Sequence, residues 1–142
     1  MTAMTADDVV RELALRPHPE GGFFREIFRD SAKEGRRGAA TSIYFLLRGG
    51  EVSAWHRVDA VEIWSFHAGA PLRLSVADEG GEITVHTLGA ALDQGERPQA
   101  IVPAGAWQSA ESCGDWTLVG CAVAPAFRFE GFDLAPEGWT PG

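Results

Sequence analysis

The chain has 142 residues with ordinary apolar and charged contents, which suits one globular domain with its own core. Its net charge of −8 argues against nucleic acid or an anionic membrane surface as a partner, because both require a basic surface. The first residues lack a basic start followed by an apolar run, no apolar stretch reaches the length of a membrane span, and the two cysteines are too few for a disulfide framework. We therefore expect a cytoplasmic protein with reduced thiols and no membrane partner.

One helix is expected near the start, from about residue 6 to residue 15. Thr5 and Asp8 have the spacing of a capping box, and apolar residues recur at helical intervals from Val9 onward. The helix should end before Pro17, because a proline disfavours helical backbone at the residue before it.

Short strands separated by glycine-containing turns follow the segment RPHPEGG. The residues DEGG at 78–81 predict a hairpin turn between two of them. Many short strands with one helix at the edge indicate a β-sandwich or barrel. A jelly roll or closed barrel is favoured over an immunoglobulin-type sandwich, since the Cys…Trp…Cys spacing is absent. The expected strands are 23–29, 41–47, 51–66, 72–76, 82–88, 100–102, 116–123 and 127–134.

The segment SAWHRVDAVEIWSFHAG, residues 53–69, places His56 and Glu62 inside an apolar, strand-like run. Alternate residues of a strand face the same side of a sheet. If the run stays in phase through Asp59 and Ala60, His56 and Glu62 share the more apolar face. A histidine and a carboxylate would then point into the same interior.

Two spacings in the chain are those of known motifs. Gly50, His56, Glu62 and Gly69 fit the first cupin motif, G-x5-H-x-H-x3,4-E-x6-G, with Val58 in place of the second histidine. The residues PAGAWQ, 103–108, look like the core of the second motif, P-x-G-x-x-H, with Gln108 in place of its histidine.

With the segments LRPHPEGGFFREIFRD and LVGCAVAPAFRFEGFDLA, these motifs make the chain similar to a small single-domain cupin family whose members open with HPEGG. The resemblance extends from about Leu15 to Leu134. It implies an all-β double-stranded β-helix, a jelly-roll barrel, with a short N-terminal helix, the barrel at about 22–134 and a single domain over 1–142. It also implies a homodimer, which would cover the edge strands of an open barrel. The family is one of unknown function and brings no established reaction.

The resemblance brings His56, Glu62 and Gln108 together where a cupin metal would lie. One imidazole, one carboxylate and one neutral amide form a poor ligand set for a transition metal. We therefore expect no cofactor and no tightly held metal, while a weakly bound divalent metal stays open. A buried His56–Glu62 pair that only organises the barrel is a further alternative.

The function that the sequence favours is small-molecule binding with catalysis of isomerase or epimerase type. The catalytic pair would be His56 and Glu62: Glu62 would hold the imidazole of His56 in one tautomer, so that it acts as general base or acid on a small polar substrate, such as a sugar derivative. Two alternatives remain, a non-catalytic ligand-binding or sensing module and a weak-metal cupin lyase or oxygenase.

Further ligand contacts are expected around this pair. Gln108 belongs to them by its motif position. Glu26 shares a strand face with Phe24 and Phe28, so that it either reaches the pocket as a ligand contact or lies at a solvated edge. Arg29 is expected on the opposite face of that strand. The glycines of HPEGG indicate a tight turn. The apolar walls are expected to include Tyr44, Trp64 and Phe66.

Overall fold

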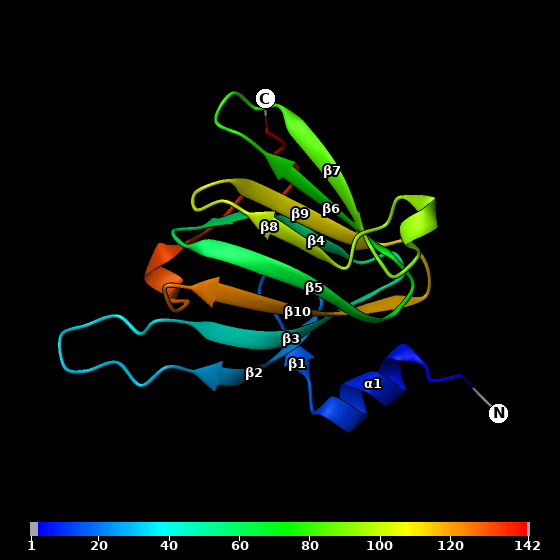
Figure 1. The fold of residues 1–142 in the computed structure, drawn as a ribbon, viewed down its shortest axis with the longest axis horizontal. Helices are drawn as coiled ribbons and strands as arrows, with labels where there is room; N and C mark the ends of the chain where they lie inside the picture. Colours follow the sequence, from blue (N-terminus) through cyan, green and yellow to red (C-terminus); the bar gives the residue numbers. More distant parts are fainter. Residues whose placement is uncertain (1–2, 142) are drawn as a thin grey trace.

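The computed structural model describes residues 3–141, which form two facing antiparallel sheets with one α-helix beside them (Figure 1). The expected all-β fold with a short N-terminal helix is confirmed. Residues 1, 2 and 142 of the expected single domain lie outside the described residues. The elements run in the order α1 (Ala6–Leu13), β1 (Arg16–Pro17), β2 (Phe23–Arg29), β3 (Thr41–Arg48), β4 (Val52–Val58), β5 (Val61–Gly69), β6 (Leu72–Ala77), β7 (Ile83–Leu88), η1 (Leu92–Gln94), β8 (Gln99–Val102), β9 (Trp107–Ser112), β10 (Trp116–Ala124), η2 (Phe129–Gly131) and β11 (Phe132–Leu134).

The helix α1 begins at the expected capping box. The backbone N–H of Asp8 donates to Thr5 Oγ1 at 3.2 Å, and the backbone N–H of Thr5 donates to Asp8 Oδ2 at 2.9 Å. The helix ends at Leu13, earlier than expected, because Ala14 takes the left-handed conformation with φ 54°. Its apolar side packs on the outer face of the larger sheet, where Val9 lies against Leu46.

The larger sheet has the strand order β1-β2-β3-β10-β5-β8, and the smaller one β11-β4-β9-β6-β7. The run expected as one strand, 51–66, is two strands in different sheets, because the chain crosses between the sheets at Asp59 and Ala60. The two-residue connection preserves the alternation. His56 on β4 and Glu62 on β5 therefore both face inward, with exposures of 1% and 7%.

Two strands were not expected from the sequence. The strand β9 lies between β4 and β6, and its buried positions include the polar Gln108, so that it lacks an apolar alternation. The strand β1 has two residues and pairs with β2. The last expected strand, 127–134, is shorter than predicted, since η2 occupies Phe129–Gly131 and only Phe132–Leu134 pairs with β4.

The hydrophobic core fills the space between the two sheets toward one end of the barrel. Its largest side chains are Phe45 and Trp64, which pack edge to face with their ring centroids 5.8 Å apart. The hairpin at 78–81 is present, with the backbone N–H of Gly81 donating to Asp78 O at 3.0 Å. Within residues 3–141 no helix has the length and hydrophobicity that a membrane crossing requires.

Candidate functional site

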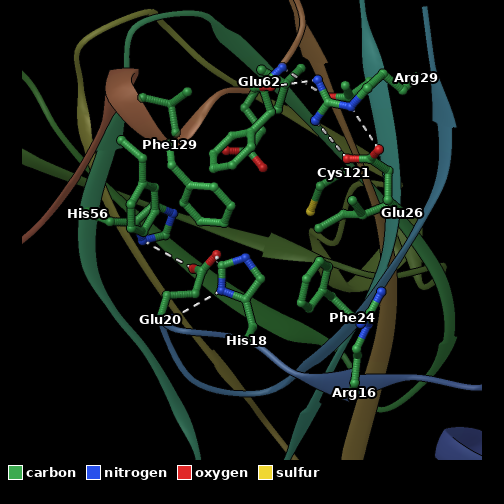
Figure 2. Close-up of a pocket in the computed structure, with 16 residues that line it drawn as sticks. Arg16, His18, Glu20, Phe24, Glu26, Arg29, His56, Glu62, Cys121 and Phe129 are labelled. Carbon is green, nitrogen blue, oxygen red and sulfur yellow. Dashed lines mark hydrogen bonds and ion pairs between the residues drawn. The ribbon is translucent and has the colours of Figure 1, made fainter.

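A cavity of about 250 Å³ lies between the two sheets, beside the hydrophobic core (Figure 2). Its apolar wall comes from β2, β3, β4, β10, β11 and the segment around η2, and includes Phe24, Ile43, Val58, Val123, Phe127, Phe129 and Phe132. Its polar and charged lining residues are Arg16, His18, Glu20, Glu26, Arg29, Thr41, His56 and Glu62. Several ionisable groups thus share a small, largely apolar space.

The HPEGG turn between β1 and β2 brings His18 and Glu20 into this cavity. The backbone N–H of His18 donates to Gly22 O at 2.9 Å, and the backbone N–H of Ala54 on β4 donates to Glu20 O at 2.8 Å. Gly21 and Gly22 have φ values of +107° and +77°, and a Cβ on either would lie 2.6 Å from a backbone carbonyl oxygen of a neighbouring strand. Only glycine fits this close approach without strain.

Glu20 lies between the two imidazole rings (Figure 2). Its Oε2 is 3.1 Å from His56 Nδ1 and its Oε1 is 3.3 Å from His18 Nδ1. The hydroxyl of Ser53 donates to the same Oε2. The side chains of Glu20, His18 and His56 are at most 9% exposed, so these contacts take place away from solvent.

The hydrogen bonds set opposite tautomers for the two histidines. His56 Nδ1 lies 2.7 Å from the carbonyl oxygen of Ala54, which can only accept, so Nδ1 carries the proton and Nε2 keeps a lone pair. His18 Nδ1 accepts from the backbone N–H of Glu20 at 3.0 Å, so its proton is on Nε2. In Figure 2 the ring nitrogen of each histidine that lies away from Glu20 points into the cavity. One ring therefore offers a base and the other an N–H donor.

Burial keeps this group close to neutral. Desolvation raises the pKa of Glu20 to about 8, against the opposing effect of the Ser53 hydrogen bond, and raises the pKa of Glu62 to about 7. Desolvation lowers the pKa of His18 to about 4, with the neighbouring His56 adding to the effect, and also lowers the pKa of His56. A protonated Glu20 can accept from Ser53 at Oε2, while its other oxygen lies beside His18 Nδ1.

On the side away from the cavity, buried hydrogen bonds link Glu62 to Gln108 and Gln108 to Trp64. The indole N–H of Trp64 donates to Gln108 Oε1 at 2.8 Å, and Gln108 Nε2 donates to Glu62 Oε1 at 2.9 Å. Because an indole nitrogen can only donate, Trp64 fixes which end of the amide faces Glu62. Gln108 therefore presents an N–H donor to the carboxylate of Glu62.

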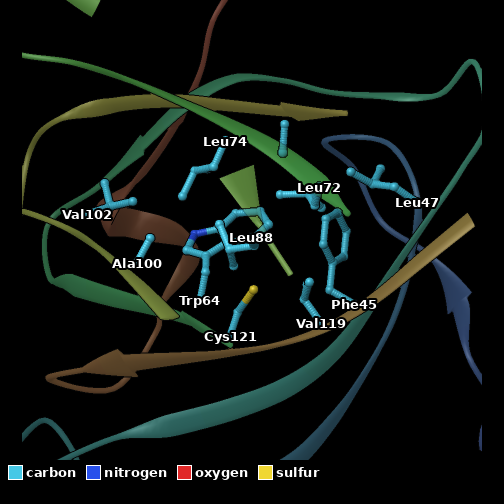
Figure 3. Close-up of a cluster of buried hydrophobic side chains, with 11 residues drawn as sticks. Phe45, Leu47, Trp64, Leu72, Leu74, Leu88, Ala100, Val102, Val119 and Cys121 are labelled. Carbon is cyan, nitrogen blue, oxygen red and sulfur yellow. The ribbon is translucent and has the colours of Figure 1, made fainter. Parts of the chain in front are cut away.

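The structure distributes the expected site residues over three places. His56, Glu62 and Glu26 line the cavity, and Gln108 lies behind Glu62. The expected apolar walls lie elsewhere, as Figure 3 shows for Trp64, which is buried in the core between Val102 and Phe45.

Each misplaced aromatic has a structural reason. Tyr44 lies on the outer face of β3, beside α1, because alternation along β3 sends Phe45 inward instead. Trp64 and Phe66 do face the barrel interior, but they pack within the hydrophobic core beyond the cavity. The cavity wall comes instead from phenylalanines of β2, the η2 segment and β11.

Sequence reasoning missed His18, Glu20, Arg16 and Arg29 as cavity residues. The two glycines of HPEGG predicted a turn. They did not predict that this turn packs against β3 and β4 and so brings His18 and Glu20 into the cavity. Arg29 was expected opposite Glu26, yet the pairing of β2 with β3 shifts register between Glu26 and Phe28. This bulge inserts Ile27 and returns Arg29 to the face of Glu26, to which it donates two hydrogen bonds of 2.9 Å.

The residues at the expected metal position do not fit a transition metal. Val58 has no donor atom, and the amide oxygen of Gln108 is already used by Trp64, so that its nitrogen faces the site. Within residues 3–141, no three His, Cys, Asp or Glu side chains are arranged to hold a metal ion. His56 and Glu62 are left as a two-ligand set, which is weak for such metals.

Residues 7–135 match the protein family described as the cupin superfamily (DUF985). A protein from Shewanella oneidensis is 44% identical with a TM-score of 0.89, over 94% of this chain and 85% of that one. A hypothetical protein from Leishmania major is 32% identical with a TM-score of 0.84, over 93% of this chain and 88% of that one. An oxalate decarboxylase from Bacillus subtilis shares the fold at 16% identity and a TM-score of 0.65, over 83% of this chain and 29% of that one. No curated protein matches the chain.

Proposed function

The chain belongs to the cupin superfamily (DUF985) and has its jelly-roll fold, and from the side chains of its cavity we propose an enzyme of isomerase or epimerase type. It would move a proton on a small polar substrate, such as a sugar derivative, without a tightly bound metal. The observation that carries this proposal is the pair of opposite tautomers, His56 with a free Nε2 and His18 with Nε2–H, on either side of Glu20.

His56 is suited to the role of general base. Burial keeps its imidazole neutral, and the bond from Nδ1 to Ala54 O holds the ring so that the Nε2 lone pair faces the cavity. When Nε2 takes a proton, the ring becomes cationic beside Glu20, and the ionised form of that carboxyl, whose pKa is about 8, stabilises the charge. Glu20 therefore acts as a positioning and charge-balancing residue.

The reaction that fits these groups is proton abstraction at a carbon next to a carbonyl. His56 Nε2 takes the proton, the electron pair of the C–H bond moves into the carbonyl to form an enolate, and the His18 N–H stabilises its oxygen by a hydrogen bond. Glu62, with a pKa of about 7, then returns a proton to the carbon. Return to the opposite face of the same carbon inverts the centre. In an α-hydroxy carbonyl substrate, return to the former carbonyl carbon, with the hydroxyl proton passing to the former carbonyl oxygen, isomerises the substrate.

Exchange of substrate C–H for solvent deuterium tests this proposal. We expect proton NMR in D₂O to show exchange on at least one member of a panel of small hydroxy-aldehydes, hydroxy-ketones and sugar derivatives. In His56→Asn the amide keeps a donor toward Ala54 O but lacks the base, so exchange should fall by about 10²–10⁴-fold. His67→Asn is the matched control, since His67 is exposed and lies outside the cavity.

Two outcomes would contradict an enzyme of this type. Exchange that survives in His56→Asn would remove His56 as the base. A panel member that binds without exchange, and loses binding in His56→Asn, would favour a non-catalytic ligand-binding module.

A further inference from the structure

Arg29 is held rigidly at the cavity with part of its guanidinium unused. Its Nε and one terminal nitrogen donate to the two carboxylate oxygens of Glu26, both at 2.9 Å, and the other terminal nitrogen donates to Phe127 O at 3.0 Å. These bonds use three of the five N–H groups of a guanidinium, so one on each terminal nitrogen remains. Figure 2 shows the guanidinium pointing from β2 into the cavity.

Arg16 supplies a second positive charge on the same cavity. It lies on β1, next to β2, and is exposed. Its guanidinium has no ion-pair partner among residues 3–141. Glu26 balances only one of the two arginines, so this wall keeps a positive charge in a chain whose net charge is −8.

The inner groups of the cavity do not cancel that charge. Burial favours the neutral form of Glu20, whose pKa is raised to about 8, and shifts Glu62 the same way. The deep end therefore carries only a partial negative charge around pH 7, on Glu62, whereas the arginines are cationic there. The cavity is polarised, with cations on the side of β1 and β2 and acid–base groups at the HPEGG turn, β4 and β5.

We propose that Arg29 forms an anion subsite, with Arg16 adding positive charge further along the same wall, and that the substrate of the cavity is a small molecule with a carboxylate or phosphate group. Its assignment to a substrate rests on the proposed function above, whereas the subsite itself does not. Arg29 keeps one N–H free on each terminal nitrogen, and each can donate to an oxygen of either anion. Glu26 orients this donor pair, and is a positioning residue.

The size of the cavity limits the rest of the ligand. Its volume of about 250 Å³ is smaller than the ~300–1,000 Å³ typical of sites for drug-sized ligands. A ligand that contacts Arg29 and His56 together therefore has room for only a short polar skeleton. The anionic group would anchor one end and place the reacting carbon near the two histidines.

Binding of simple anions to the whole protein tests the subsite directly. Acetate and inorganic phosphate serve as probes in titrations at constant ionic strength, followed by NMR shifts, with chloride as the reference ion. We expect one of them to bind in the wild type, Arg29→Met to weaken its binding by about 10-fold or more, and Arg16→Met to weaken it less, because Arg16 adds only charge to the wall. Arg29→Lys should keep part of the affinity, because it retains the charge but loses the paired donors. Stronger binding of acetate indicates a carboxylate substrate, and stronger binding of phosphate a phosphate ester.

Arg48→Met is the matched control. Arg48 also pairs with a glutamate three residues away, Glu51 at 3.0 Å, but it lies outside the cavity. The subsite is refuted if neither anion binds better than chloride, or if Arg48→Met weakens binding as much as Arg29→Met does. Circular dichroism shows whether each variant is folded.

His56→Asn separates this inference from the proposed function. It should retain anion binding while losing deuterium exchange. Anion binding that needs Arg29, without exchange on any substrate, would support the subsite and contradict the enzyme. Exchange that is equally fast in Arg29→Met would support the enzyme and contradict the subsite.

Discussion

Glu20 Oε2 lies 3.1 Å from His56 Nδ1, although one residue belongs to the turn before β2 and the other to the middle of β4. Both side chains are shielded from solvent, so neither can change its protonation without affecting the other. The regular geometry of a strand positions only His56, whereas the turn formed by the two glycines after Glu20 positions its partner. This contact between a turn and a strand is the basis of the first prediction.

We predict that the free energy of unfolding falls as the pH rises from about 6.5 to about 8. Glu20 and Glu62 have folded pKa values of about 8 and about 7, above the usual 4.5, so their protons stabilise the folded state and are lost over this range. The histidines oppose this loss only in its lower part, because their pKa values are lowered in the folded state and an unfolded histidine loses its proton around pH 6.5. Urea denaturation at several pH values should show a loss of roughly 1–2 kcal/mol.

Glu20→Gln checks the origin of that slope. The amide can imitate the protonated carboxyl as a neutral group that accepts from Ser53, so the variant should fold. It should lose most of the pH dependence, while Glu79→Gln in the exposed 78–81 turn should keep it. A wild-type slope in Glu20→Gln would show that the slope comes from other groups.

Gln108→Leu should destabilise the protein by about 2–4 kcal/mol in chemical denaturation. It leaves the indole N–H of Trp64 and a carboxylate oxygen of Glu62 buried without their partner. Gln99→Leu is the control, since Gln99 makes one side-chain bond, to Ser65 at 3.0 Å, in an exposed position. If both substitutions cost the same, the chain behind Glu62 does not contribute as described.

Gly22→Ala should cost roughly 3 kcal/mol or more and disturb the cavity. The new Cβ would lie 2.6 Å from Leu46 O and 2.9 Å from Leu47 Cδ2, on a backbone with φ +77°. Gly35→Ala has nearly the same backbone, φ +75°, with no atom within 4 Å of the Cβ, so it should cost only about 1 kcal/mol. Thermal or urea unfolding of the two variants separates the effect of the steric clash at Gly22 from that of backbone strain. Equal losses of unfolding free energy in both would exclude a role for the clash.

We expect protein purified without added metal or chelator, and then dialysed, to retain far less than one Fe, Mn, Ni or Zn per chain. The reason is the donor set, because Val58 cannot ligate and the Gln108 oxygen accepts from Trp64. The double variant Val58→His/Gln108→His should gain affinity for such ions in calorimetric titration. Elemental analysis that finds about one ion per wild-type chain after dialysis would contradict this prediction.

The parts of the fold that follow from local pattern were predictable. The strand Phe23–Arg29 and the capping box at Thr5 were predicted with the bounds and contacts that the structure has. The division of 51–66 between two sheets was not, because the turn at Asp59 and Ala60 leaves the alternation unchanged. The strand β9 was missed because its buried Gln108 belongs to a tertiary hydrogen-bond chain that a local pattern does not show.

The residues of the candidate site also fall into those that the sequence predicted and those that it did not. His56 and Glu62 could be predicted from strand phase, and Gln108 from its motif position. His18 and Glu20 depend on where a loop crosses other strands, and Arg29 depends on a bulge, neither of which has a signal in one sequence. The homodimer, the cytoplasmic location and the absence of a cofactor remain predictions.

The hydrogen bonds of Gln108 also have a mechanical consequence. Gln108 belongs to the smaller sheet, whereas Trp64 and Glu62, which it contacts, belong to the larger one. Any sliding of one sheet over the other must break both bonds inside an apolar interior, where no water replaces them. His56 and Glu62 also lie on opposite sheets. The two hydrogen bonds of Gln108 therefore fix the distance between them. The width of the cavity between His56 and Glu62 is thus preorganised before a substrate binds. Little of the binding free energy is then needed to bring the two sheets together.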